Sequence, residues 1–141
     1  MTILTAKNTP RVTYTASSSQ TAFAIPFEFF STSDIKVYNG TTLLTYEATP
    51  SAANKYSITG TASASDSAYE FGAGGTITLG GSGATAGDII TIIRDITIER
   101  STDFPTSGTF DITSLNTDLD KVYAKLADID QQSDRSVKLL D

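Results

Sequence analysis

The 141-residue sequence contains no histidine, no cysteine and no tryptophan. A chain without cysteine can form neither a disulfide framework nor a thiolate zinc site. A chain without histidine lacks the side chain that most often transfers protons near neutral pH, which is also the commonest metal ligand. We therefore expect a protein that needs no cofactor and no metal ion.

Positive charge is also sparse and scattered. Ten lysine and arginine residues stand against sixteen aspartate and glutamate residues, which gives a net charge of -6. Because a phosphate backbone is bound by clustered cations that displace counterions, we expect no nucleic-acid partner. No segment approaches the roughly 18 apolar residues of a membrane span, and the first residues do not resemble a signal peptide. We expect no membrane partner either.

Serine, threonine and glycine are plentiful, and the hydrophobic fraction is 39%. Short apolar or alternating runs between turn signals predict about eight strands. The run Thr21–Phe30 contains Pro26, so it is predicted as an edge strand or as two short pieces. Asn39-Gly40 predicts a tight hairpin. Further strands are predicted at 11–15, 55–60, 76–79 and 88–99, the last long enough to bend near Arg94-Asp95 and serve two sheet edges.

These patterns predict a mainly β fold, an antiparallel β-sandwich-like domain followed by a C-terminal α-helix. The glycine-rich stretch "GGSGATAGD" at 80–88 lacks the ending of a phosphate-binding loop and is predicted as a hairpin turn. The predicted organisation is a β-rich domain at 1–104, a connector at 105–113 and a helix at 114–141. Candidate helix caps are Asp111, Thr113 and Ser114.

Two sets of side chains could form a functional site, one for docking and one for catalysis. Four phenylalanines are predicted to fill the core, with an exposed docking ridge as the alternative: Phe23, Phe27, Phe29 and Phe30. Asp66 with Glu70, and Asp95 with Glu99, could form a glycosidase carboxylate pair. Neither pair comes with an aromatic binding groove. We interpret them as solvated charges and expect no catalytic residues.

The C-terminal helix carries apolar residues at spacings of three and four. They occupy the a and d positions of a heptad repeat: Ile112, Leu115, Leu119, Val122, Leu126 and Ile129. Leucine at a with β-branched residues at d disfavours two strands and shifts the preference to three or four. Lys125 at g and Asp130 at the next e position have the spacing of an interchain ion pair, with a contribution of about 0 to 1 kcal/mol. The sequence predicts a parallel trimeric coiled coil; the alternative is that the stripe packs on the chain's own sheet.

The order of these features resembles the N-terminal tail-anchor domain of tail fibres and tailspikes from short-tailed, podovirus-type bacteriophages. The resemblance rests on "FAIPFEFF", "IKVY", "YSIT", the segment from Arg94 to Arg100, the "TDF" run from Thr102 to Phe104, and Leu115-Asn116 followed by a helix. It covers the chain from about Val12 to Leu139, and it is carried by the order of the motifs.

The resemblance implies a structural virion protein in the phage tail, assembled in the host cytoplasm as a homotrimer. Its implied partners are the tail adaptor and nozzle proteins. In the family a shaft and a receptor-binding tip follow this domain, whereas this sequence ends at Asp141. Two expectations follow: a stand-alone anchor that receives a separate distal fibre or spike protein, or an anchor without its distal region.

Two other functions remain open from the sequence. The chain could be the N-terminal module of a polysaccharide-depolymerising tailspike, in which case the protein would show depolymerase activity. It could also be a β-sandwich glycan-binding module, in which case it would bind a glycan array. The non-enzymatic anchor is our leading interpretation.

Overall fold

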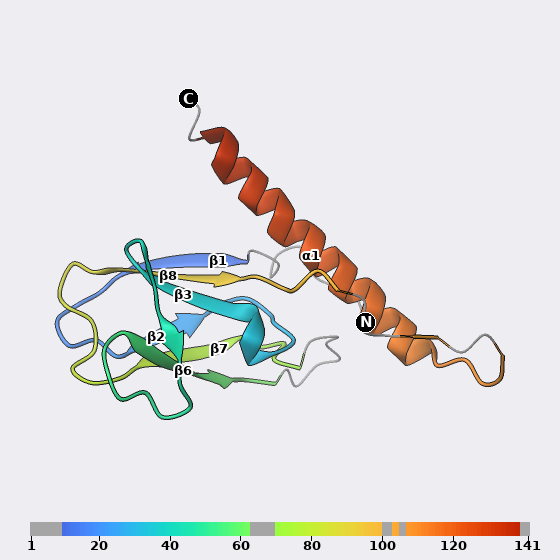
Figure 1. Ribbon diagram of the computed structural model, residues 1–141, viewed down its shortest axis with the longest axis horizontal. Coiled ribbons are helices and arrows are strands. Elements are labelled where there is room, and N and C mark those ends of the chain that lie inside the picture. The colour runs from blue at the N-terminus through green and yellow to red at the C-terminus, as the bar shows by residue number, and fades with distance from the viewer. Residues whose placement is uncertain (1–9, 63–69, 100–102, 105–106, 139–141) are drawn as a thin grey trace.

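The computed structural model describes residues 10–62, 70–99, 103–104 and 107–138. Within these ranges the chain forms a β-rich body and one long C-terminal α-helix (Figure 1). The elements are β1 (Arg11–Thr15), β2 (Ala22–Ile25), the 3-10 helix η2 (Thr32–Asp34), β3 (Ile35–Asn39), β4 (Thr42–Leu43), β5 (Thr45–Tyr46), β6 (Lys55–Gly60), β7 (Gly75–Leu79), β8 (Ile89–Arg94) and α1 (Ile112–Lys138).

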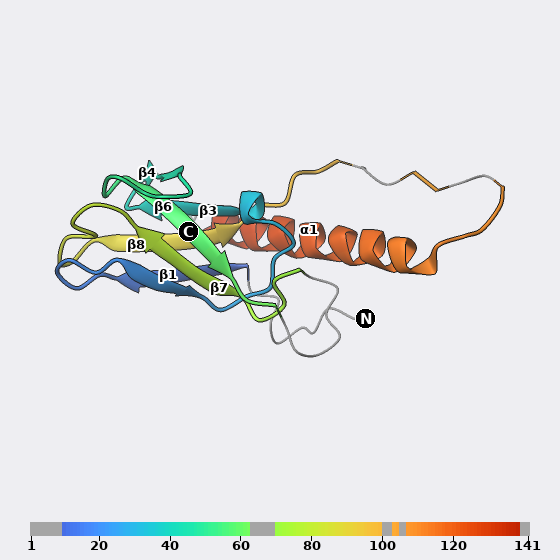
Figure 2. The same cartoon turned by 90° about the horizontal axis from the view of Figure 1, so that it is seen from below.

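The strands form two four-stranded sheets with the orders β1-β8-β3-β4 and β2-β7-β6-β5. Figures 1 and 2 show the sheets stacked face to face, which confirms the predicted mainly β, sandwich-like body followed by a helix. The pairings between these strands are antiparallel except for β5 with β6, which is parallel. Side chains alternate along each strand, so one face of each sheet enters the shared core.

The apolar stretch around Pro26 lies at one edge of the sandwich. As predicted, the stretch divides into two pieces: β2 is an edge strand, and Phe29 beyond the proline forms an isolated bridge with Phe71. Phe23, Phe27 and Phe29 are buried in the main core, which confirms the core prediction for these three, and Phe30 is buried in a second cluster with Ala124. Burial of such side chains contributes about 1.5 to 3 kcal/mol each.

The predicted hairpin is present with its turn moved by one residue. Asn39 pairs with Thr42, so the turn residues are Gly40 and Thr41 rather than Asn39 and Gly40. Gly40 has a φ of 58°. A glycine adopts this left-handed conformation without steric cost, which suits the first turn position.

Two expectations about the last strands were wrong. The 80–88 segment is not a hairpin turn, because it joins β7 in one sheet to β8 in the other. The last strand ends at Arg94 instead of continuing to Glu99. It reaches two neighbours without bending, since β8 lies between β1 and β3 and pairs with both.

The helix begins at Ile112, two residues before the predicted boundary. After β8 the described parts of the connector run away from the sandwich beside α1, and the chain then returns through the helix (Figure 2). The helix therefore starts at the end far from the sandwich and meets the sandwich near the middle of the helix, at Ala124 and Asp128. Its C-terminal part then extends away from the strands (Figure 1). Within the described ranges, no helix has the length and apolarity to cross a membrane.

Candidate self-association surface

The start of α1 is fixed by Asp111. The Thr113 backbone N–H donates to Asp111 Oδ1 at 3.0 Å, and Ser114 Oγ donates to Asp111 Oδ2 at 2.6 Å. These two hydrogen bonds lower the pKa of Asp111, with the Ser114 bond the larger cause. Among the three candidate caps, the structure selects Asp111, which satisfies a backbone donor left free by the helix start.

One face of α1, the docked face, is buried; its residues are small or acidic, and Ala124 and Asp128 on it contact the sandwich. Asp120, Ala124 and Asp128 are buried, at intervals of four residues. Residues four apart lie one above the other on a helix, so these three form a single stripe. In the heptad numbering they occupy the b, f and c positions, which lie outside a coiled-coil seam.

A buried ion pair joins this face to the end of β8. Arg94 Nε and Nη2 donate to Asp128 Oδ1 at 3.1 Å and 2.9 Å, and the two side chains are 0% and 6% exposed. Arg94 Nη1 donates to the Glu28 carbonyl at 2.9 Å, and Nη2 also donates to the Ala124 carbonyl at 3.4 Å. Arg94 thus connects β8, the segment before η2 and the helix. We call the Arg94–Asp128 pair the clasp.

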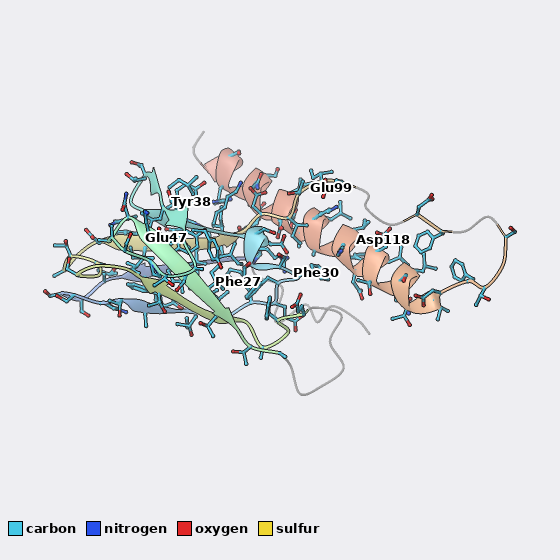
Figure 3. All side chains as sticks on the ribbon, turned by 60° about the horizontal axis from the view of Figure 1, so that its bottom comes forward. Phe27, Phe30, Tyr38, Glu47, Glu99 and Asp118 are labelled. Carbon is cyan, nitrogen blue, oxygen red and sulfur yellow. The ribbon has the colours of Figure 1, made fainter. Side chains whose placement is uncertain are left out.

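The surroundings of the clasp are apolar on one side. Phe30 and Ala124 form a second small core, with Ile96 packed against it. Lys121 Nζ lies 5.6 Å from the centre of the Phe30 ring, a cation–π contact. Figure 3 shows Phe30 between the sandwich and the helix. Burial raises the pKa of Asp128, and the Arg94 guanidinium opposes that rise.

The opposite face of α1 carries the predicted a and d residues, and they are largely exposed. The exposed fractions are 64% for Ile112, 48% for Leu119, 46% for Val122, 56% for Leu126 and 47% for Ile129, while Leu115 is intermediate. We call these six residues the seam.

The seam and the docked face point in nearly opposite directions. Leu126 and Asp128 are two residues apart, which at about 100° per residue places them about 160° apart around the helix. The alternative that the stripe packs on the chain's own sheet is therefore wrong. The chain's own sheets take up the polar face, where Ala124 and the clasp lie, and leave the apolar face uncovered.

The predicted ion-pair residues lie beside the seam. Asp130 is exposed, whereas Lys125 Nζ donates to the Glu99 carbonyl at 2.9 Å. An interchain pair between Lys125 and Asp130 would have to replace or share that hydrogen bond. The pair remains a prediction.

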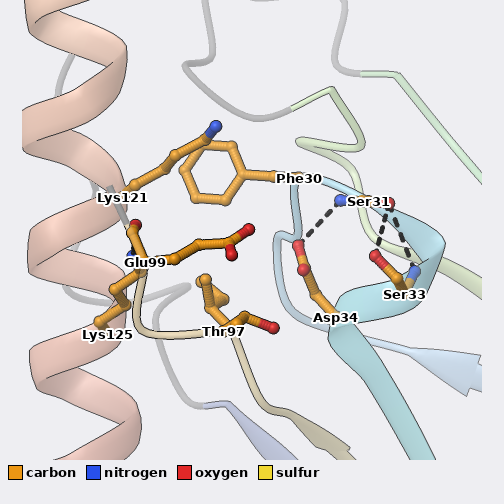
Figure 4. A pocket seen from close by; sticks show the side chains of 9 residues that line it. Phe30, Ser31, Ser33, Asp34, Thr97, Glu99, Lys121 and Lys125 are labelled. Atoms are coloured by element: carbon orange, nitrogen blue, oxygen red, sulfur yellow. Dashed lines mark hydrogen bonds between the residues drawn. The ribbon is translucent and has the colours of Figure 1, made fainter. Parts of the chain in front are cut away.

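A cleft with a volume of about 150 Å³ lies where η2, the connector and the helix meet. In Figure 4, Lys121 and Lys125 enter it from α1, and Glu99 extends between the helix and η2. Asp34 forms the far wall, where its Oδ2 accepts from the Ser31 N–H at 2.9 Å. Burial raises the pKa of Asp34. With both signs of charge on its walls, the cleft has no marked preference for an anion or a cation.

Of the two proposed carboxylate pairs, Asp95 with Glu99 lies within the described residues, and the two side chains have different surroundings. Asp95 forms an ion pair with Lys36, and that hydrogen bond raises the pKa of Lys36. Glu99 lies in the cleft beside α1 (Figure 3). Asp66 lies outside the described residues, and its partner Glu70 is exposed. No cluster of three or more potential ligands within the described ranges could hold a metal ion.

Sequence reasoning missed Arg94 and Asp128. One signal was available for Arg94, because a charge that directly follows the apolar run "IITII" ends a buried strand and needs a partner there. Asp128 gave no comparable signal among the many acidic residues of the helix. No protein-family model and no curated protein sequence matches the chain.

Proposed function

We propose that the protein is a non-enzymatic, homotrimeric tail fibre or tailspike anchor, a structural virion protein that links a host-recognition fibre to the phage tail. Three α1 helices associate in parallel through the seam, and the sandwiches remain outside the bundle. The observation that carries this proposal is the exposure of the seam on the side of α1 opposite the clasp.

The physical reason for association is the apolar surface left in water. Burial of apolar area contributes about 25 cal/mol per Å², and five of the six seam residues are 46% to 64% exposed. The sandwich occupies only positions that face outward in a coiled coil, so three chains can meet without displacing it. In the two heptads from Leu119 to Ile129, leucine at a with valine and isoleucine at d favours three or four strands.

The role in the tail rests on the order of sequence features that resembles tail-anchor domains. A parallel bundle suits an anchor, because its side-by-side chains present one three-fold end to the tail and another to a fibre. The adaptor and nozzle proteins are the proposed tail partners.

The self-association is tested by measuring the mass of the full chain in solution by light scattering. We expect three times the chain mass of 14.9 kDa. The double variant Leu119→Asp with Leu126→Asp should reduce the mass to that of one chain, because carboxylates cannot be buried unpaired in the seam. The control variant Thr113→Asp with Asn116→Asp adds the same charge at exposed positions outside the seam and should stay trimeric. An unmodified chain that is monomeric contradicts the proposal.

The attachment is tested by cryo-EM of virions that carry the protein. Three-fold density for the bundle, with three sandwiches beside the adaptor and nozzle rings, is the expected result. Depolymerase and glycan-array assays on the 141-residue protein test the two alternative functions. Activity would favour the tailspike enzyme, and glycan binding would favour the glycan-binding module.

A further inference from the structure

The joint between α1 and the sandwich is small. Its apolar part consists of Phe30, Ala124 and the partly buried Ile96. A contact of so few side chains gives limited burial and little directional preference, because the hydrophobic effect is not directional. The polar part of the joint is different: the clasp fixes an arginine fork, a carboxylate and two backbone carbonyls at hydrogen-bond distances.

The clasp also specifies one register of the helix. A slide of α1 by one turn in either direction would bring Ala124 or Lys125, or Gln131 or Gln132, to the place of Asp128. None of these four residues is acidic. Each such register would take the Asp128 carboxylate away from the buried Arg94 guanidinium, which is strongly unfavourable. The Ile96 N–H, 3.4 Å from Asp128 Oδ2, adds a further contact that only this register provides.

We infer that Arg94 and Asp128 are positioning residues that hold each sandwich at one fixed angle to the self-association helix, as an outward arm of the assembly. The inference rests on the proposed function, since it takes the seam as the axis of the bundle. Each sandwich points outward from the axis of the bundle, because the docked face lies nearly opposite the seam around α1. Loss of the clasp frees the arm to swing while the seam and the sandwich stay intact.

A gain in stability does not explain why a charged pair occupies this position. Replacement of a buried ion pair by well-packed apolar residues is often neutral or stabilising, so a simple gain in stability does not require the charges. A defined direction does require them, because hydrogen bonds depend on angle and apolar contacts do not. An apolar replacement should therefore keep the helix near the sandwich but allow more than one register.

The absence of cysteine permits a direct measurement. Cysteines introduced by Thr15→Cys and Gln132→Cys carry nitroxide labels, and both positions are exposed. Thr15 pairs with Ile89 at the end of β8 far from Arg94, so a swing about the clasp moves it most. Labelled chains are diluted with an excess of unlabelled chains, so that each assembly reports one intrachain distance by pulsed electron resonance.

We expect a single narrow distance distribution for the unmodified clasp. Asp128→Asn should widen it at least twofold, and Arg94→Met with Asp128→Leu should also widen it without loss of the strand signals in NMR spectra. Asp134→Asn, the same change at an exposed position of α1 outside the seam, should leave the width unchanged. A narrow distribution with the same mean in both clasp variants would overturn the inference.

Light scattering on the same samples separates this inference from the proposed function. A monomer with a narrow distribution that widens in the clasp variants refutes the trimer and keeps the positioning role. An unchanged trimer with a narrow distribution in every variant keeps the trimer and refutes the positioning role.

Discussion

Leu126 and Asp128 lie two residues apart on α1 and have opposite surroundings: Asp128 is buried against Arg94 of the sandwich, while Leu126 is 56% exposed. An ordinary amphipathic helix would bury its leucines on its own sheet. Here a carboxylate and an alanine take that place. The helix therefore has one face in contact with the rest of the chain and an apolar face that remains exposed.

The clasp gives the sharpest stability prediction. Asp128→Ala removes one partner of a buried ion pair and leaves the Arg94 guanidinium without its carboxylate, so it should cost about 3 to 5 kcal/mol in the free energy of docking the helix. Asp134→Ala removes an exposed carboxylate outside the seam and should change stability by less than about 0.5 kcal/mol. Urea unfolding, followed by circular dichroism of the helix, measures both. Equal effects of the two substitutions would show that the clasp is not buried in solution.

Ala124 offers an independent test of the same joint. The residue is 0% exposed and its carbonyl lies 3.4 Å from Arg94 Nη2, so Ala124→Leu should overpack the joint at a cost of about 1 to 3 kcal/mol. Ala127→Leu makes the same change at a position that is only partly buried, and it should cost less. Thermal unfolding of the two variants gives the comparison. A more stable Ala124→Leu variant would mean that the joint contains unfilled space.

The sequence patterns predicted those features of the fold that depend on local periodicity. The spacing from Ile112 to Ile129 identified the apolar face of the helix, and Pro26 identified the edge position of β2, because each follows from backbone geometry alone. Patterns of this kind do not specify which elements meet. The 80–88 segment crosses between the sheets, although its glycines suit a hairpin equally well, and the pairing of Arg94 with Asp128 spans 34 residues. Long-range contacts of single side chains leave no periodic trace in the sequence.

The pH dependence of one loop follows from Glu47. Its Oε1 accepts from Lys55 Nζ at 2.8 Å, and its Oε2 accepts from the Ser51 N–H at 2.8 Å. The Lys55 hydrogen bond, followed by the Ser51 bonds, lowers the pKa of Glu47 from 4.5 to about 2. A carboxylate with a lowered folded-state pKa stabilises the fold above its unfolded pKa and loses that contribution as the pH falls from 4.5 through 2.

NMR titration of the Glu47 side-chain carboxyl measures this directly. In the folded chain the Glu47 carboxyl should titrate near pH 2, and Lys55→Ala should raise the pKa of Glu47 toward its ordinary value of 4.5. Glu47→Gln should remove the loss of folding stability that protonation of Glu47 causes as the pH falls from 4.5 through 2. A Glu47 pKa that is the same with and without the Lys55 side chain would contradict the stated cause.

The residue types in the seam predict a change of assembly number. At present the a positions 119 and 126 are leucine, and the d positions 122 and 129 are valine and isoleucine. In parallel coils β-branched residues at a with leucine at d favour two strands, because each position packs its side chains at a different angle to the axis. The variant with Leu119→Ile, Val122→Leu, Leu126→Ile and Ile129→Leu therefore exchanges the two preferences while it keeps every seam position aliphatic. Light scattering should show the mass fall from three chains to two. A variant that remains trimeric would show that the sandwiches or the connector, and not the seam, set the number of chains, and a monomeric variant would show that the seam depends on the original side-chain shapes.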